Sequence, residues 1–421
     1  MLADFVLALG HAHSLVLNNK DGSVWSTAIT SYGGNLPSRG TRKTFERLIA
    51  SGAMLAAAGT AFSIVVNRDG AVWGMGRNYR GQLGDGTKRR SSSFAFVQMI
   101  NNPKAVAAGG HHTIVVTQEG YVLVAGCNKF GQLGDGLATY TTRFKVQNQA
   151  MSSGTRATGV AAGGTHSLVL KEDGSVWAAG RNCHGQLGDG SQFHSNTFVM
   201  VMTSGAVDVS AGGYHSMVLK DDGSVWATGW NEYGQLGDGS TNDRDNYVQV
   251  VSSGAKAVAA GSRHSLMLGK DGSVWATGYN EYGQLGAEST TNSKMFVRVI
   301  PDGVKVIAAG GVHSMILKQD GSVWATGSNE DGQFGDGLPV SYKTFVEIAP
   351  FGNGSRYCHV HHAFILMSLY LVCSVPVPLA LLPNRFRSTT TVHAKADLVA
   401  NATMASGITV ADGEATSDGG D

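Results

Sequence analysis

The chain has 421 residues and a formal net charge of +1 at pH 7, with 32 Lys and Arg against 31 Asp and Glu. Acidic and basic residues are interspersed, so no basic stripe is present to hold phosphates, and nucleic acid is not expected as the main ligand. The four cysteines form no Cys-x-x-Cys pair. A disulfide framework is therefore not expected, which is typical of a reducing compartment.

A motif of about 50 residues recurs along the chain. Its clearest copy spans 161–190 and reads AAGGTHSLVLKEDGSVWAAGRNCHGQLGDG. Aligned on the motif histidine, the copies are 49, 50, 54, 49, 49 and 49 residues apart. The aligned residues are His13, Phe62, His112, His166, His215, His264 and His313. A period of this length predicts an array or a closed ring of one supersecondary unit.

Each copy contains the signals of short strands and tight turns in a fixed order. In the clearest copy, the apolar run 166–170 is followed by Asp173-Gly174, a strong hairpin signal, and by the returning strand 175–180. A glycine-punctuated loop spans 182–190, and a further strand spans 198–201. The unit is therefore predicted to hold about four short strands and no helix.

The strands of the hairpin do not alternate between apolar and polar residues, so both faces of each sheet are expected to be buried. Radially packed sheets satisfy this requirement, because each lies between two neighbours. We therefore predict an all-β fold, a seven-bladed β-propeller over residues 1–350, with a non-propeller C-terminal tail. The expected repeats are 1–50, 51–100, 101–154, 155–204, 205–253, 254–302 and 303–350.

At these motifs the chain resembles the regulator-of-chromosome-condensation repeat family. The matching text, AxGxxHSLxLxxDGxVWxxGxNxxGQLGDG, is carried in whole or part by residues 8–350. The resemblance implies a seven-bladed propeller. The founder of the family acts as a nucleotide-exchange factor for a Ran-type small GTPase and docks on chromatin, a plant relative is an ultraviolet-B photoreceptor, and many others bind proteins. One fold hosts several activities, so the resemblance predicts the fold better than the function.

Residues that recur at one repeat position in most copies are interpreted as structural. This set comprises Trp25, Trp73, Trp177, Trp226, Trp275, Trp324, His166, His215, His264 and His313. The tryptophans are expected in the core, and the histidines are expected to satisfy backbone groups beside the glycine turns. The recurring Gly-Asp-Gly is interpreted as turn chemistry, because a 50-residue period cannot stack carboxylates around calcium. No catalytic residue, metal ligand or cofactor is predicted.

The residue before the repeat histidine varies between copies, and variation on a constant scaffold is where recognition is expected. We predict a partner-binding surface from His111, Thr165, Tyr214 and Arg263, together with Trp230 at a variable loop position. The resemblance implies that the exchange factor contacts its GTPase through acidic and histidine residues at this position. No copy here carries Asp there, and Arg263 lacks the tryptophan that precedes its counterpart in the photoreceptor.

The leading prediction is a non-enzymatic, monomeric scaffold that binds a protein partner through one loop-rich face. The alternatives are a guanine-nucleotide exchange factor for a Ran-type small GTPase and a membrane-tethered propeller scaffold. A cytoplasmic or nuclear location is expected for the first two, and a membrane-associated location for the third.

The chain departs from the repeat after residue 350. Residues 351–383 begin like an eighth repeat but contain an uncharged apolar stretch at 363–382, long enough to cross a bilayer and interrupted by Pro376 and Pro378. This stretch is interpreted as a membrane anchor, as a strand that competes to close the ring, or as a degenerate end of the reading frame. Residues 384–421 are predicted to be disordered.

Overall fold

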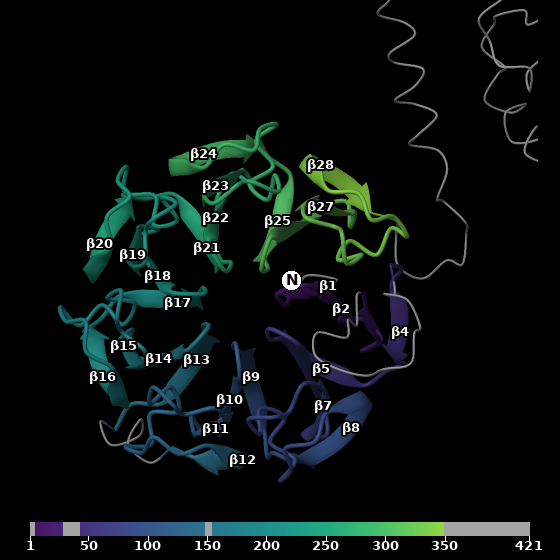
Figure 1. Cartoon of the computed structure of the whole chain (residues 1–421), viewed down its shortest axis with the longest axis vertical. Coiled ribbons are helices and arrows are strands. Elements are labelled where there is room, and N and C mark those ends of the chain that lie inside the picture. Colours follow the sequence, from purple (N-terminus) through teal and green to yellow (C-terminus); the bar gives the residue numbers. More distant parts are fainter. Residues whose placement is uncertain (1–4, 28–42, 148–153, 349–421) are drawn as a thin grey trace, which may run out of the picture. The chain divides into compact units, whose positions relative to one another are not determined.

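The computed structural model describes residues 5–27, 43–147 and 154–348. These residues form seven four-stranded antiparallel sheets, each made of four consecutive strands, and they contain no helix. The sheets are arranged as blades around a central axis (Figure 1). The prediction of an all-β, seven-bladed propeller is confirmed. The segments predicted as an apolar stretch (351–383) and a disordered tail (384–421) lie outside the described residues.

The strands of the first four blades follow the repeats in chain order. Blade 1 comprises β1 (Phe5–Leu9), β2 (Ser14–Asn18), β3 (Val24–Ser26) and β4 (Glu46–Ile49). Blade 2 comprises β5 (Ala53–Ala58), β6 (Phe62–Asn67), β7 (Ala71–Gly76) and β8 (Ser91–Met99). Blade 3 comprises β9 (Pro103–Ala108), β10 (His112–Thr117), β11 (Val122–Gly126) and β12 (Thr141–Val146). Blade 4 comprises β13 (Ala157–Ala162), β14 (His166–Lys171), β15 (Val176–Gly180) and β16 (Ser195–Met202).

The remaining three blades repeat this order. Blade 5 comprises β17 (Ala206–Ala211), β18 (His215–Lys220), β19 (Val225–Gly229) and β20 (Arg244–Val251). Blade 6 comprises β21 (Ala255–Ala260), β22 (His264–Gly269), β23 (Val274–Gly278) and β24 (Ser293–Ile300). Blade 7 comprises β25 (Val304–Ala309), β26 (His313–Lys318), β27 (Val323–Gly327) and β28 (Tyr342–Ile348).

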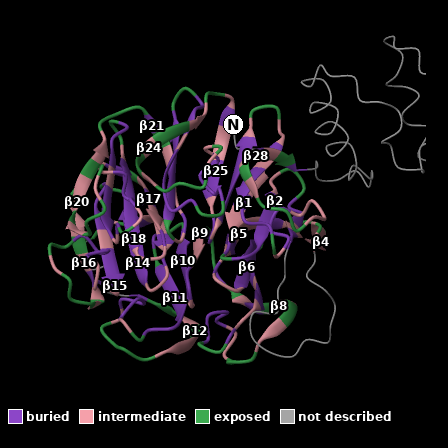
Figure 2. Ribbon diagram, turned by 45° about the horizontal axis from the view of Figure 1, so that its top comes forward, coloured by how far each residue is buried: buried purple, intermediate pink, exposed green. Residues whose placement is uncertain are grey.

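The hydrophobic core lies between the blades. The second strand of a blade is buried along nearly its whole length, while the outermost strand is mostly half-buried (Figure 2). One cluster joins Leu168 and Leu187 of blade 4 to Val209 and Val218 of blade 5. Because each sheet buries both faces against its neighbours, its second strand reads as a continuous apolar run rather than an alternating one.

The repeat histidines form a girdle of hydrogen bonds between blades, and not the bonds to backbone groups that the sequence suggested. His215 Nε2 lies 2.9 Å from Ser265 Oγ in the next blade, and Ser265 Oγ donates to the carbonyl of Gln235 over 2.7 Å. Because the single hydroxyl proton of Ser265 is donated to this carbonyl, His215 Nε2–H must donate to the serine oxygen. The equivalent bonds join His13–Ser63, His112–Ser167, His166–Ser216, His264–Ser314 and His313–Ser14.

The interface between blades 2 and 3 is the exception in the girdle. Phe62 replaces the histidine, and Thr113 stands where the other blades have the accepting serine. Thr113 Oγ1 still donates to the carbonyl of Gln82 over 2.6 Å. The two substitutions belong together, because a phenyl ring has no proton to give to the hydroxyl beside it.

The ring closes between blades 7 and 1 with the same contacts that join consecutive blades. His313 Nε2 lies 3.0 Å from Ser14 Oγ, and the backbone N–H of Gly311 donates to the carbonyl of Gly10 over 3.1 Å. All four strands of blade 1 come from residues 5–49, and all four of blade 7 from 304–348. Closure within the described residues therefore uses packing and girdle bonds, without an exchanged strand.

The glycine-rich loop after the third strand locks each blade to the next. In blade 5, Asn231 Oδ1 accepts from the backbone N–H of Leu236, and Asn231 Nδ2 donates to Asp238. Gly237 has a φ of 79°, and a Cβ there would lie 2.6 Å from the ring of Phe296 in blade 6. Glycine is therefore required both by the left-handed backbone and by the aromatic ring of the next blade.

The repeat tryptophans are half-buried, which corrects the expectation that they fill the core. Trp226 packs on the cluster between blades 4 and 5, and its Nε1–H donates to Ser224 Oγ over 3.0 Å. An indole that must reach a hydroxyl near the hairpin turn keeps part of its edge at the surface. Trp73 lacks this bond because Ala71 stands in the serine position, and its Nε1 is buried without a partner. The half-buried set is Trp25, Trp73, Trp177, Trp226, Trp275 and Trp324.

Candidate functional site: an aromatic–arginine stripe on the loop face

One end of the propeller collects the loops between the first and second strands and those between the third and fourth. The two loops of a blade meet because the second and third strands are antiparallel and His215 is paired with Gly229. Consequently Tyr214, which precedes the histidine, lies beside Trp230, which follows the glycine, and the Trp230 N–H donates to the Tyr214 carbonyl over 2.9 Å. We call this end the loop face.

The same backbone bond pairs two variable residues in other blades. The pairs are Ala61–Arg77, His111–Cys127, Thr165–Arg181, Arg263–Tyr279 and Val312–Ser328. Thus the variable position before the histidine has a second variable position beside it, 16 residues later in each described copy. The sequence singled out only Trp230 at this second position and missed Arg181 and Tyr279, although the same alignment displays the variation.

Three of the five predicted binding residues are connected, because Tyr214 and Arg263 both contact Trp230. The rings of Tyr214 and Trp230 are 5.8 Å apart at 89°. The Arg263 guanidinium lies 5.6 Å from the Trp230 ring, 5.6 Å from the Tyr233 ring and 5.7 Å from the Tyr279 ring. Each of these distances is within the range of a cation–π interaction. Arg263, from blade 6, thereby bridges to the aromatic side chains of blade 5.

Arg181 continues the arrangement across blade 4. Its guanidinium lies 5.1 Å from the ring of Phe130 in blade 3 and 5.3 Å from the ring of Tyr214 in blade 5. We call the connected set the aromatic–arginine stripe. It consists of Phe130, Arg181, His184, Tyr214, Trp230, Tyr233, Arg263, Tyr279 and Tyr282. It runs over blades 3 to 6, although its members are up to 152 residues apart in the sequence.

The two arginines of the stripe are not paired with carboxylates of the described residues. Within the described residues, neither Arg181 nor Arg263 forms an ion pair with a carboxylate. The acidic groups nearby have other partners, since Tyr279 OH donates to Glu281 and His184 Nδ1 lies 2.8 Å from Asp243. Burial and the neighbouring Glu281 raise the pKa of Tyr279 to about 12, so this hydroxyl stays protonated. Arg181 Nε donates to Cys183 Sγ over 3.0 Å, and the terminal N–H groups of the two stacked guanidinium groups are the ones that a ligand could use.

The other two predicted residues lie outside the stripe. His111 is half-buried in blade 3, and burial together with Arg77 and Arg80 lowers its pKa. Thr165 is half-buried in blade 4, with its hydroxyl buried and without a hydrogen-bond partner. The ring contacts within the described residues include neither side chain.

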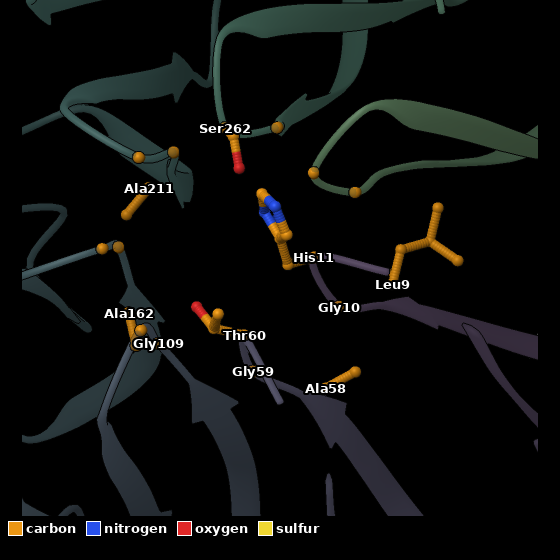
Figure 3. Close-up of a pocket in the computed structure, with 18 of the residues that line it drawn as sticks. Leu9, Gly10, His11, Ala58, Gly59, Thr60, Gly109, Ala162, Ala211 and Ser262 are labelled. Atoms are coloured by element: carbon orange, nitrogen blue, oxygen red, sulfur yellow. The ribbon is translucent and has the colours of Figure 1, made fainter. Parts of the chain in front are cut away.

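A cavity of about 90 Å³ opens on the axis at the loop face. Its lining is mostly glycine and alanine, and its polar side chains are His11, Thr60 and Ser262. His11 projects into the middle of the opening (Figure 3). The glycines are required, since a Cβ on Gly110 would lie 2.3 Å from the Gly164 carbonyl oxygen of the next blade. This close backbone ring leaves room for small groups only.

The arrangement suits contact with another macromolecule. In the three described ranges, no group of three or more His, Cys, Asp or Glu side chains could hold a metal ion. The same ranges contain no helix that is long and apolar enough to span a bilayer. The loop face presents the exposed Arg263 and the half-buried Arg181 against aromatic rings, and arginine and aromatic side chains are favoured at protein interfaces.

Comparison with known proteins supplies the family. A sequence profile described as the RCC1-like domain matches residues 3–251 and 57–364, so the chain belongs to the RCC1-like domain family. Human WBSCR16 is similar in structure, with 22% identity, a TM-score of 0.68, and coverage of 78% of this chain and 89% of that one. No curated protein sequence matches.

Yeast RCC1 is similar as well. The structure of Prp20 bound to Kap60 has a TM-score of 0.67 and 18% identity over 83% of this chain and 85% of that one. A second structure, of Prp20p from Saccharomyces cerevisiae, has a TM-score of 0.66 and 19% identity over 83% and 86%, and its description names binding to Gsp1p and histones. At these identities the similarity establishes the fold.

Proposed function

We propose that this propeller is a non-enzymatic scaffold that binds a protein partner through the aromatic–arginine stripe. One observation carries the proposal: Arg181 and Arg263 are held in place by aromatic rings and pair with no carboxylate of the part of the chain that the structure describes. Fixing a guanidinium before binding reduces the entropy that association must overcome. Tyrosine, tryptophan and arginine also dominate the binding energy of measured interfaces.

The test is affinity capture followed by mass spectrometry, with the wild type and the Tyr214→Ala/Arg263→Ala variant. The matched control is Tyr121→Ala/Lys270→Ala, which removes an exposed tyrosine and an exposed cation from hairpin turns at the opposite end. We expect the stripe variant to lose partners that the control retains, at an unchanged melting temperature. Partners retained equally by both variants would refute the placement.

Nucleotide exchange on a Ran-type small GTPase is the second candidate. It is supported by family membership and by the structural similarity to Prp20p, whose description names Gsp1p. Such an activity needs no covalent chemistry, since a protein that binds the nucleotide-free GTPase more tightly shifts its equilibrium. Release of a fluorescent guanine nucleotide from a Ran-type GTPase tests it. Acceleration of at least about ten-fold by substoichiometric protein supports exchange, and an unchanged rate supports the scaffold.

The membrane-tethered scaffold remains a prediction, because the stretch 363–382 lies outside the described residues. Membrane fractionation of the full chain and of a chain lacking 363–421 tests it. Recovery of both forms in the soluble fraction would remove this alternative.

A further inference from the structure

The loop face is electrically divided, although the whole chain is nearly neutral. The loop 77–90 of blade 2 carries five basic residues and one acidic residue. The corresponding loops of blades 5, 6 and 7, at 230–243, 279–292 and 328–341, carry eight acidic residues and no Lys or Arg. Blade 2 lies across the axis from blades 5 and 6 (Figure 1). We call the two regions the basic cluster (Arg77, Arg80, Lys88, Arg89 and Arg90) and the acidic arc.

The basic cluster is organised by an aromatic ring from the next blade. Arg80 Nη1 donates to Tyr140 OH over 3.1 Å, and its guanidinium lies 5.1 Å from the Tyr140 ring. Lys88 Nζ lies 5.9 Å from the same ring. Tyr140 belongs to blade 3, so the two cations converge on one side chain across the interface between blades. A guanidinium fixed in this way keeps several N–H groups for an oxygen ligand.

Three cations of the cluster are not neutralised within the described residues. Arg80, Lys88 and Arg89 are exposed, and none forms an ion pair there with a carboxylate. Asp85, the one acidic residue of the loop, accepts hydrogen bonds from Asn78 and Thr87 instead. Its carboxylate therefore serves the structure of the loop.

The positive charge of the basic cluster affects the pKa of the neighbouring His111. Burial is the main cause that lowers its pKa, and Arg77 and Arg80 lower it further. The imidazole is therefore neutral at pH 7 and can donate or accept one hydrogen bond beside the cations.

We propose that the basic cluster binds an acidic segment, rich in Asp and Glu, of the partner protein. Charge complementarity indicates an anion, and the division of the face limits its extent. A long polyanion such as nucleic acid would approach exposed carboxylates of the acidic arc, among them Glu232, Glu288 and Glu330, as it crossed the face, whereas a short acidic segment contacts blades 2 and 3 alone. The inference rests on the proposed function, since the partner is the one bound by the stripe.

The experiment measures binding of fluorescein-labelled octaglutamate to the full chain by anisotropy, with octaglutamine as the neutral control and a ten-residue oligothymidylate as the nucleic-acid probe. We expect octaglutamate to bind, octaglutamine not to bind, and affinity to fall at least about ten-fold between 50 and 300 mM NaCl because salt screens exposed charges. The variant Arg80→Ala/Lys88→Ala/Arg89→Ala should bind at least about ten-fold more weakly.

Two further variants keep the test decisive. Lys88→Ala/Arg89→Ala leaves the bond between Arg80 and Tyr140 intact and should still weaken binding, which separates lost charge from a displaced loop. Glu232→Gln/Glu281→Gln in the acidic arc should not weaken it. Equal binding of octaglutamate by the wild type and the triple variant would overturn the proposal. So would tighter binding of the oligonucleotide with the same dependence on these residues.

The outcome is distinguishable from failure of the proposed function. If octaglutamate does not bind but Tyr214→Ala/Arg263→Ala loses its partners, the acidic-segment inference is wrong and the scaffold proposal stands. If octaglutamate binds through the cluster but the stripe variant retains every partner, the cluster is supported and the stripe is refuted.

Discussion

The histidine girdle should make the propeller sensitive to mild acid. Burial lowers the pKa of His112, His166, His215 and His313 to about 3, and that of His13 and His264 to about 4. In the unfolded chain each has a pKa near 6.5. Below pH 6.5 these histidines are therefore protonated in the unfolded state but remain neutral in the folded state. Stability should fall from that pH until the folded pKa values are reached.

The six histidines act together, so the expected effect is large. Lowering the pH from 7.5 to 6.0 favours the unfolded state by about 0.8 kcal/mol per histidine, or about 4–5 kcal/mol in all. Burial raises the pKa of Asp208 to about 6, and protonation of this carboxyl offsets less than about 1 kcal/mol of the loss. The remainder is comparable with the total stability of a small domain, about 5–15 kcal/mol.

Urea unfolding followed by tryptophan fluorescence at pH 7.5, 6.5 and 6.0 measures this loss. The variant His215→Phe/Ser265→Thr reproduces the natural pair Phe62–Thr113 and should lower the number of protons taken up on unfolding at pH 6.0 by about 0.8. A free energy of unfolding that stays within about 1 kcal/mol over this pH range would refute the reasoning. It would show that the girdle histidines are protonated in the folded protein.

Two local substitutions test the packing. Gly237→Ala should cost at least about 3 kcal/mol, since the methyl group meets the Phe296 ring as well as a left-handed backbone, whereas Gly254→Ala, at a φ of 88° with no atom within 4 Å, should cost about 1 kcal/mol. Equal losses of stability in thermal unfolding would show that the backbone conformation alone determines the cost of the two substitutions. Ala71→Ser should stabilise blade 2 by about 1 kcal/mol by giving Trp73 Nε1 the acceptor it lacks. An unchanged free energy of unfolding in urea would show that Trp73 Nε1 already has a hydrogen-bond acceptor.

The repeat was sufficient to predict the ring, because the sequence signals of the strands and turns are local and occur in seven copies. The Asp-Gly hairpins, the glycine turns and the apolar second strands each act within one unit. The roles of the polar residues that recur between the copies were harder to assign. His215 bonds Ser265, 50 residues later, and no property of either residue alone reveals the pair. Only stacking one blade on the next brings them within hydrogen-bond distance.

The candidate site was predicted in part. Variation before the histidine indicated Tyr214 and Arg263, and a variable loop position indicated Trp230. Arg181 and Tyr279 occupy a second variable position that becomes adjacent to the first only through strand pairing. His111 and Thr165 were grouped with the others by alignment, but blades 3 and 4 place them away from the contacts around Arg263.

By itself, the sequence determined the unit: its length, its strands, its turns and the number of its copies. Those features depend on residues within about 50 positions of one another, where period and turn chemistry are legible. Tertiary structure alone decided which variable residues touch, which histidine bonds which serine, and how a chain of net charge +1 separates into a basic cluster and an acidic arc. Closing the ring sets distances between side chains from different blades, and no local pattern encodes those distances.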